Sequence, residues 1–185
     1  MIEDIRKDAD ERMAKSVEAL RHTFARIRTG RANPALLQGI MVPYYGNDTP
    51  LQQVASINVE DARTLVIAPW EKSLLTEIER AIQKSDLGIN PSSGGGVIRV
   101  PMPPLTEQTR RELTKQAKHE AEHARVAVRN VRRDAIADIR ELVKEKGATE
   151  DDARRAEESI QKVTDRWITE VDHALAEKES DLLEV

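Results

Sequence analysis

The chain has 185 residues and a formal net charge of −4, with 39% hydrophobic and 34% charged residues, which suits one medium domain or two small ones. It contains no cysteine, so disulfides, thiolate metal sites and cysteine nucleophiles are excluded and a reducing compartment is favoured. Because no secretory signal is visible and no apolar run approaches the roughly 18 residues of a membrane span, we expect a cytoplasmic protein that does not bind membranes.

The first predicted element is a helix over residues 2–27. Apolar residues recur in this segment at steps of three and four, which is the spacing of one helical face. Gly30 follows as the predicted C′ residue, in the left-handed conformation that ends many helices, and Pro34 stands just beyond it. The sequence therefore predicts that this helix stops before Gly30.

Residues 31–104 have a different pattern, which predicts a small α/β domain. Short runs rich in β-branched and aromatic residues predict strands at residues 40–45, 54–57, 64–68 and 97–100. The segment Gly46–Asp48 predicts a turn, and Pro50 predicts a further break. Residues 73–84 predict one short amphipathic helix with its apolar side facing inward.

Two more long helices are predicted after this segment. The second begins beyond Pro104 with Thr106 as its N-cap and ends at Gly147. The third begins at Thr149, is followed by acidic residues that favour the positive end of a helix dipole, and has an apolar line that reaches Leu182. No one of the three long helices can bury its apolar stripe alone, so together they predict a three-helix bundle.

The elements together predict an α+β protein of two domains. Residues 1–30 and 105–185 are expected to form the elongated three-helix bundle, with residues 31–104 inserted as a β-α-β sandwich. Two segments of chain then join the domains, which limits their motion to that of a hinge. The predicted hinge residues are Gly30, Arg31, Pro103 and Pro104.

Charge is unevenly distributed along the chain, with +3 over residues 107–146 and −7 over residues 149–185. On a helical wheel, basic residues of the second long helix fall within an arc of about 100° beside the apolar line. We call this set the basic stripe: Arg111, Lys115, Lys118, Arg125, Arg129, Arg132 and Arg133. Glu122 is the only acidic residue in that arc. Arginine suits phosphate well, so the stripe predicts contact with folded RNA. The alternatives are a solvated face and pairing with the acidic third helix.

Patterns typical of catalysis occur in contexts that argue against catalysis. His119 and His123 have the spacing of a zinc protease motif, but the wheel places them toward solvent without a third ligand nearby. The glycine-rich segment Ser92–Gly96 lacks a following lysine and leads into a strand, so a mobile loop is predicted instead of a phosphate cradle. Trp70 is predicted to pack a loop onto its own domain. We expect no catalytic residue, metal or cofactor; the runner-up to RNA binding is a protein-interaction module that binds a helical partner.

Several long segments are distinctive when taken together. They are Arg28–Pro34, Asn90–Leu105, Val128–Asp134, Glu150–Arg155 and Gln161–Asp165. In these segments, and over essentially its whole length, the chain resembles the ribosome recycling factors of bacteria and organelles. The resemblance implies a three-helix bundle and a smaller α/β domain, arranged in an L like a transfer RNA. It also implies a monomer that binds the post-termination ribosome. With elongation factor G and GTP, such a factor promotes dissociation into subunits and release from mRNA.

The resemblance also implies roles for individual residues. Arg110, Arg129 and Arg132 would be the main contacts to the RNA of the large ribosomal subunit. Arg28 and Arg31, near the hinge, would support them, and Arg125 and Arg133 join this set from the basic stripe. Hydrolysis of GTP would belong to the elongation factor, which agrees with the missing phosphate loop. The histidine pair and the segment Gln108-Thr109 depart from the family pattern.

Overall fold

The computed structural model describes residues 1–184, and contacts divide the chain into two compact units. One unit combines Met1–Phe24 with Thr114–Ser180, and the other combines Ala25–Leu113 with the chain from Asp181 onward. The ends of the long helices are thus grouped with the second of these units. The fold class is the predicted α+β one, with an α/β unit inserted in sequence between long helices. The domain limits at residues 30–31 and 104–105 stay a prediction.

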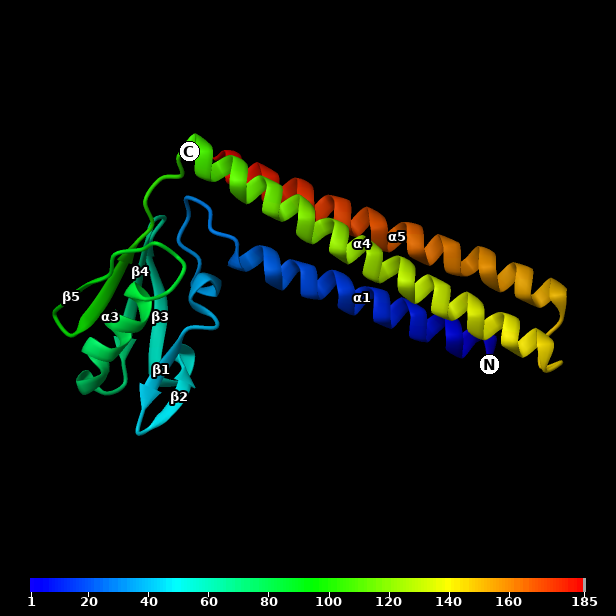
Figure 1. Cartoon of the computed structure of the whole chain (residues 1–185), viewed down its shortest axis with the longest axis horizontal. Helices are drawn as coiled ribbons and strands as arrows, with labels where there is room; N and C mark the ends of the chain where they lie inside the picture. Colours follow the sequence, from blue (N-terminus) through cyan, green and yellow to red (C-terminus); the bar gives the residue numbers. More distant parts are fainter. Residues whose placement is uncertain (185) are drawn as a thin grey trace. The chain divides into compact units, whose positions relative to one another are not determined.

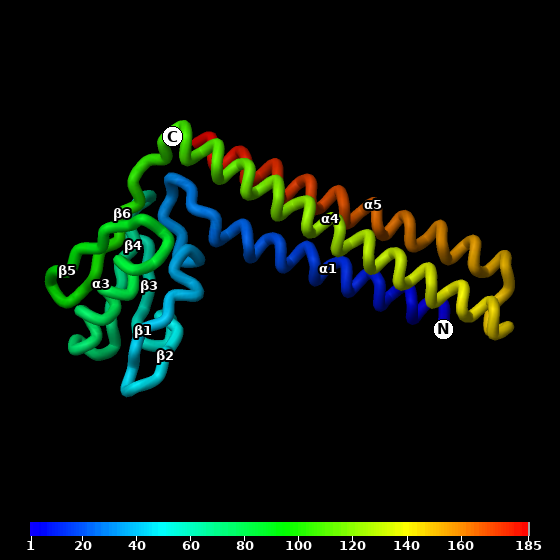
Figure 2. The backbone as a smooth tube through the Cα atoms, in the orientation of Figure 1, coloured from blue at the N-terminus to red at the C-terminus, as the bar shows by residue number. Residues whose placement is uncertain are grey.

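The long helices lie side by side in the first unit (Figure 1 and Figure 2). Their bounds are α1 (Ile2–Arg26), α4 (Glu107–Lys144) and α5 (Glu150–Leu183). α4 and α5 are antiparallel, because Arg125 pairs with Asp172 near the middle of the hairpin and Arg140 pairs with Glu157 near its turn. Buried side chains at the predicted helical spacing form the core, including Met13, Val17, Leu20, Val128, Ile139 and Ile160. The predicted bundle is therefore confirmed.

Both α4 and α5 begin where the sequence predicts, which is after Thr106 as the N-cap of α4 and at Thr149 as the start of α5. The Thr106 hydroxyl accepts a hydrogen bond from the backbone N–H of Thr109 at 3.1 Å, which caps α4. The Thr149 hydroxyl accepts one from the N–H of Asp152 at 3.0 Å, and the Asp152 carboxylate accepts the Thr149 N–H in return at 3.3 Å. This reciprocal arrangement satisfies two helix-end donors at once. The hydrogen bonds from Thr149 lower the pKa of Asp152.

The end of α1 differs from the prediction. The helix stops at Arg26, and Gly30 does not have the left-handed backbone of a C′ residue. The chain turns instead at the buried Thr29, whose hydroxyl accepts the backbone N–H of Arg31 at 3.1 Å. A short side-chain hydrogen bond of this kind stabilises a turn without glycine. The prediction of Gly30 as a cap was therefore wrong.

The end of α4 lies close to the predicted end at Gly147, since the helix stops at Lys144. The left-handed position is occupied by Lys146, with a φ of 62°, one residue before Gly147. The Gly147 N–H then donates to the Leu142 carbonyl at 2.8 Å. This is the hydrogen bond of a Schellman ending, and it satisfies a carbonyl that the helix leaves unpaired.

The second unit contains short strands and helical turns. Its elements are η1 (Pro34–Leu37), β1 (Met41–Tyr44), β2 (Asn47–Pro50), α2 (Leu51–Val54), β3 (Ala55–Asp61), β4 (Thr64–Pro69), η2 (Lys72–Leu74), α3 (Leu75–Gln83), β5 (Ser92–Gly94) and β6 (Val97–Pro101). Within residues 1–184, β3, β4, β6 and β5 form an antiparallel sheet in that order, and β1 pairs with β2 in a separate hairpin. Figure 2 shows β6 between β4 and β5.

The core of this unit lies between the sheet and α3. Alternate residues of the two central strands are buried, as the period of two in a strand requires: Leu65, Ile67, Ile98 and Val100. Ile78 and Ile82 of α3 are buried in the same cluster. The predicted strands at residues 64–68 and 97–100 and the amphipathic helix at residues 73–84 are thus confirmed, with the first turn of that helix formed as η2.

Two strands occur where the sequence predicts a turn and a loop. β2 covers Asn47–Pro50, because Tyr45 and Gly46 both have positive φ and make the tight turn of a hairpin. β5 covers Ser92–Gly94, and the adjoining Gly95 and Gly96 with positive φ connect it to β6. The segment predicted as a mobile loop is therefore an edge strand and a turn. Polar and glycine residues have low strand propensity, so the pattern alone did not reveal either strand.

Candidate nucleic-acid interface

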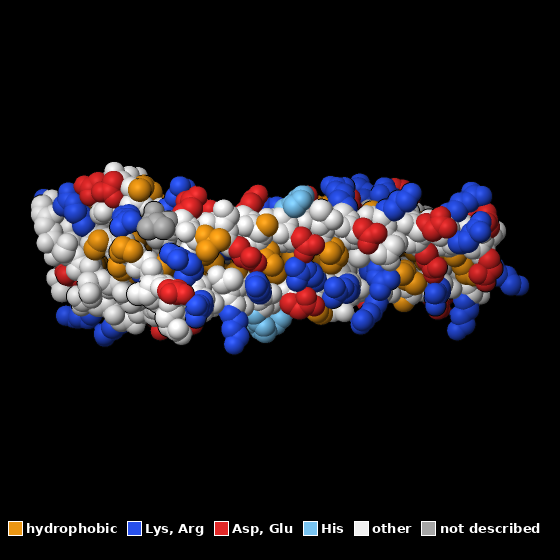
Figure 3. Space-filling model, turned by 90° about the horizontal axis from the view of Figure 1, so that it is seen from above, with side chains coloured by type: hydrophobic (Ala, Val, Ile, Leu, Met, Phe, Trp, Pro, Cys, Tyr) orange, Lys and Arg blue, Asp and Glu red, His pale blue; other side chains and the backbone are white. Residues whose placement is uncertain are grey.

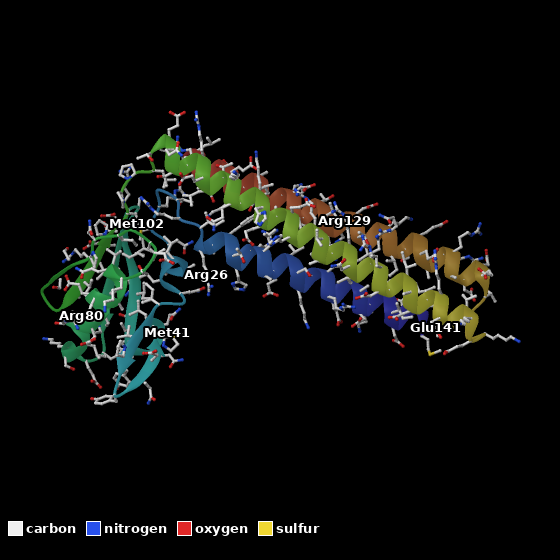
Figure 4. The ribbon with its side chains drawn as sticks, in the orientation of Figure 1. Arg26, Met41, Arg80, Met102, Arg129 and Glu141 are labelled. Atoms are coloured by element: carbon white, nitrogen blue, oxygen red, sulfur yellow. The ribbon has the colours of Figure 1, made fainter. Side chains whose placement is uncertain are left out.

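The basic stripe lies on α4, where Figure 4 labels Arg129, and all of its residues except Arg111 belong to the first unit. Alanine and valine residues of the same helix are buried, including Ala117, Ala121, Ala124, Val128 and Val131. Burial of that face against α1 and α5 leaves the stripe beside the core and open to solvent. Lys115, Lys118, Arg129 and Arg133 are exposed, and Arg125 and Arg132 are half-buried.

Arg125 is held on both sides by carboxylates. Its guanidinium donates to Asp172 Oδ1 on α5 at 3.1 Å from Nε and 2.7 Å from Nη2, and to Glu122 Oε2 at 3.1 Å from Nη1. Its side chain is only 21% exposed. The hydrogen bonds to Asp172, ahead of those to Glu122, raise the pKa of Arg125. The main role of Arg125 is therefore to link α4 to α5, and it is only partly available as a surface cation.

Arg129 shares a carboxylate with Arg125. Its Nη1 lies 3.3 Å from Glu122 Oε1, so one side chain of α4 bridges two arginines of the basic stripe. Hydrogen bonds from Arg125 first, and from Arg129 next, hold the pKa of Glu122 below its ordinary value. Arg129 is 45% exposed, which leaves much of its guanidinium accessible to a ligand.

The next two arginines of the stripe differ in their contacts. Arg132 Nη1 donates to Gln161 Oε1 on α5 at 3.2 Å, and Gln161 in turn donates to Asp165 at 2.8 Å. Arg133 is exposed and has no hydrogen bond or ion pair within residues 1–184. The stripe thus contains the unpaired guanidinium of Arg133 beside that of Arg132, which donates to the neutral side-chain amide of Gln161. A phosphate can replace such a contact at little cost.

An acidic side chain interrupts the stripe, because Glu122 pairs with both Arg125 and Arg129. On the face of the helices seen in Figure 3, Lys and Arg side chains are interspersed with Asp and Glu side chains. The acidic third helix supplies Asp172 to Arg125 and Glu157 to Arg140. One alternative interpretation of the stripe was that its basic residues pair with the acidic third helix. This interpretation is correct for Arg125. Arg129, Arg132 and Arg133 lack an acidic partner on α5 among the described residues.

Arg110 and Arg111 belong to the part of α4 that is grouped with the second unit. Arg111 is exposed and pairs with Glu107 one turn away at 2.6 Å. Arg110 is half-buried, and its Nε is buried without a hydrogen-bond partner within the described part of the chain. An unsatisfied buried donor is uncommon in proteins, and Arg28 and Arg110 are the two residues of the described chain that have one.

The two segments predicted as hinges are linked to one another. Arg28 Nη2 donates to the carbonyl of Pro103 at 3.0 Å, although its Nε, like that of Arg110, is buried without a partner among residues 1–184. Arg31 pairs with Glu184 at 2.9 Å. All of these residues lie in the second unit. Arg28 is thus a structural residue of the connecting segments as well as a candidate RNA contact.

Both connecting segments are also fixed to the turn between β3 and β4. The N–H of Ala32 donates to the Ala62 carbonyl at 2.8 Å, and the N–H of Met102 donates to the Arg63 carbonyl at 2.6 Å. Each segment is therefore anchored to the sheet at one point. The residues between these anchors and the long helices include Gly30, Pro103 and Pro104, where the sequence predicts the hinge.

Other candidate sites gain little from the structure. His119 and His123 are exposed with ring centroids 4.3 Å apart, and among residues 1–184 no group of at least three His, Cys, Asp or Glu side chains is placed to hold a metal ion. Trp70 is 66% exposed, so the prediction that it packs onto its own domain was wrong. No helix in the described chain is long and apolar enough to cross a membrane.

A groove of about 530 Å³ lies in the second unit beside α3 and the β1–β2 hairpin. Its charged lining residues have both signs and are Asp48, Glu77, Arg80, Lys84 and Asp86. Figure 4 labels Arg80 and Met41, which both line it. This mixture favours neither an anionic nor a cationic ligand, so the arginines of α4 remain the stronger candidate site.

Sequence reasoning missed the residues that hold the arginines in place. Asp172 and Gln161 lie on α5 and contact Arg125 and Arg132, and Glu184 contacts Arg31 from the last residues described. The acidic charge of the third helix indicated partners of this kind. The pattern could not identify individual pairs, because these depend on how the helices are aligned along one another.

Comparison with known proteins gives one consistent result. The family model described as ribosome recycling factor matches residues 20–183. The ribosome-recycling factors of Hahella chejuensis and Legionella pneumophila are 61% and 57% identical to the chain over 185 residues, which is the full length of each.

Solved structures agree with this result. A solution structure of the ribosome recycling factor has 42% identity and a TM-score of 0.76 over 100% of this chain and 98% of its own. A model of the T. thermophilus ribosome recycling factor, bound with the E. coli elongation factor G to the E. coli post-termination complex, has 43% identity and a TM-score of 0.69 over 100% of both chains. The chain belongs to the ribosome recycling factor family.

Proposed function

We propose that this protein binds the post-termination ribosome. With elongation factor G and GTP, it would promote dissociation into subunits and release from mRNA. Ribosome recycling factors are non-enzymatic translation factors, and one similar structure is described as bound to the post-termination complex with elongation factor G. A cytoplasmic monomer is part of the proposal. The observation that carries it is family membership over nearly the whole chain, together with an accessible arginine stripe on α4.

In this proposal the three-helix bundle is the part of the protein that binds ribosomal RNA. Arg129, Arg132 and Arg133 would donate charge-assisted hydrogen bonds to phosphates of the large subunit, since the planar guanidinium matches phosphate oxygens. Arg110, which is half-buried, would add a further contact to this RNA. A rigid helix with cations at regular spacing recognises the shape of folded RNA instead of its base sequence.

The small domain is the part that we propose to move. Its connecting segments are anchored to the β3–β4 turn at Ala32 and Met102, so rotation would be absorbed beyond these points, at Gly30, Arg31, Pro103 and Pro104. Elongation factor G would supply the force through GTP hydrolysis. The bundle, held by its arginine contacts, would stay on the large subunit while the displaced domain breaks contacts between the subunits.

The binding step is tested by measuring affinity for isolated large ribosomal subunits over a range of salt concentrations. Each phosphate contact contributes about 0.9 to the slope of log affinity against log salt. Arg129→Ala and Arg132→Ala are each expected to weaken binding by about tenfold and to reduce the slope by about one. Arg12→Ala is the matched control, because Arg12 is also 45% exposed and makes one ion pair, but lies on α1. Binding that is insensitive to salt and to both substitutions would favour a protein-interaction module instead.

A further inference from the structure

Glu122 is the one acidic residue inside the basic stripe, and its position is well defined. Residues 122, 125 and 129 are separated by three and four positions, so their side chains lie on one face of α4. The Glu122 carboxylate accepts from Arg125 through Oε2 at 3.1 Å and from Arg129 through Oε1 at 3.3 Å. It therefore uses both oxygens to bind the guanidinium groups, as a phosphate would.

We propose that Glu122 is an internal competitor for RNA phosphate at Arg129 and thereby limits the affinity of the stripe for RNA. This inference rests on the proposed function, because it assumes that Arg129 binds ribosomal RNA. In the free protein the carboxylate occupies the guanidinium of Arg129. On the ribosome a phosphate displaces it, and the carboxylate then remains near the phosphate and repels it.

The contacts of Arg125 keep Glu122 in this position. Arg125 is largely buried and is fixed from α5 by Asp172. Its third hydrogen bond goes to Glu122. The Glu122 carboxylate therefore keeps its hydrogen bond to Arg125 even when Arg129 turns away to bind a phosphate. A glutamate on a free surface would turn away from an incoming phosphate at little cost. Here the hydrogen bond to Arg125 keeps the negative charge within the binding surface.

The contact between Glu122 and Arg129 is suited to exchange. The two side chains are 52% and 45% exposed and are joined by one hydrogen bond of 3.3 Å, so water screens their attraction. An RNA phosphate can be contacted by Arg129 together with the neighbouring Arg132 or Arg133, which makes the displacement favourable. Because the Glu122 carboxylate is 52% exposed, its repulsion of phosphate acts mainly on the association rate and on the salt dependence.

The test is to measure binding of the full chain to isolated large ribosomal subunits at several salt concentrations. Glu122→Gln is expected to tighten binding about threefold to tenfold, chiefly through faster association, and to steepen the salt dependence by up to about one in slope. Glu141→Gln is the matched control. It removes the same charge from α4 about 28 Å further along, from a residue without an ion pair among the described residues (Figure 4).

A second pair of variants separates failure of this inference from failure of the proposed function. In an Arg129→Ala background, Glu122→Gln is expected to raise the logarithm of the affinity by no more than half as much as it does in the natural chain. The reason is that the contact between Arg129 and phosphate, for which Glu122 competes, is then absent. If Arg129→Ala weakens binding but Glu122→Gln leaves binding unchanged or weaker, then Glu122 orients Arg129 for binding and does not compete with phosphate. That result would overturn the inference. An equal gain from Glu141→Gln would overturn it too, because the effect would be general charge. If Arg129→Ala binds like the natural chain, the assumed RNA contact is itself refuted.

Discussion

The indole N–H of Trp167 on α5 donates to Asp10 Oδ1 on α1 at 2.6 Å. Both residues are half-buried, and the Arg166 guanidinium carbon lies 4.8 Å from the centre of a Trp167 ring. The hydrogen bond joins helices whose residues are 157 positions apart in sequence. It is thus a specific polar contact by which α1 closes against the α4–α5 hairpin, in addition to the apolar core.

Loss of this contact should weaken the bundle. Asp10→Ala leaves the half-buried indole donor unpaired, so the free energy of unfolding should fall by about 1 to 2 kcal/mol. The measurement is urea denaturation followed by circular dichroism. Asp8→Ala, at an exposed position of the same helix, should change stability by less than about 0.5 kcal/mol. Equal effects of the two substitutions would show that the hydrogen bond contributes nothing specific.

Substitutions at Arg125 and Arg129 should have different effects. Arg125 should contribute mainly to stability, and Arg129 should contribute mainly to RNA binding. Arg125→Ala removes two hydrogen bonds to Asp172 and one to Glu122, so it should lower the free energy of unfolding by about 1 kcal/mol. Arg129→Ala removes one exposed contact and should change stability by less than about 0.5 kcal/mol. Thermal denaturation of both variants beside their affinities for large subunits gives the comparison. A stable Arg125→Ala variant with a large loss of RNA affinity would contradict this division.

The acid titration of Glu122 should report the same network. Its folded pKa is lowered, so the stabilisation is present above the unfolded pKa and is lost as the pH falls through the folded value. Carboxyl NMR should show that Arg125→Ala moves the pKa of Glu122 back toward its ordinary value more than Arg129→Ala does, because Arg125 is the larger cause. The reverse order would show that Arg129 is the main partner of Glu122.

The sequence was a good guide wherever one periodic signal decided the structure. Apolar steps of three and four identified all the long helices, and α4 and α5 begin at the predicted Thr106 and Thr149. The prediction failed at Gly30, because a turn built by the Thr29 hydroxyl has no strong local pattern, and nothing in the sequence indicated the left-handed Lys146. β2 and β5 were missed because pairing with a neighbour, not propensity, makes them strands.

For the candidate site, the sequence predicted the arc but not the state of each arginine within it. That Glu122 lies in the arc follows from helical geometry, and the structure adds that it bonds to Arg125 and Arg129. The partners Asp172 and Gln161 depend on the alignment of α5 along α4, which no local pattern contains. For this reason a helical wheel cannot distinguish a half-buried cross-link such as Arg125 from an exposed cation such as Arg133.

The connecting segments should become more mobile when Arg28 is removed. Arg28→Ala deletes the hydrogen bond to the Pro103 carbonyl, so amide exchange at residues 29–31 and at Leu105 should become faster. Overall stability should change little, because the substitution also removes a buried Nε that has no partner in the described structure. Hydrogen exchange with mass spectrometry is the measurement, and Arg26→Ala, at an exposed neighbour, is the control. Unchanged exchange in Arg28→Ala would mean that this bond does not restrain the segments.

The measurement that tests the account most directly is light scattering of post-termination ribosomes mixed with this protein, elongation factor G and GTP. The natural chain is expected to split the ribosomes into subunits and lower the scattering. The double variant Arg129→Ala/Arg132→Ala should slow splitting by about tenfold or more at equal concentration, because charge-assisted phosphate contacts are lost, while Arg12→Ala should match the natural chain. Splitting at full rate by the double variant would contradict the role of the stripe, and no splitting by the natural chain would contradict the proposed function itself.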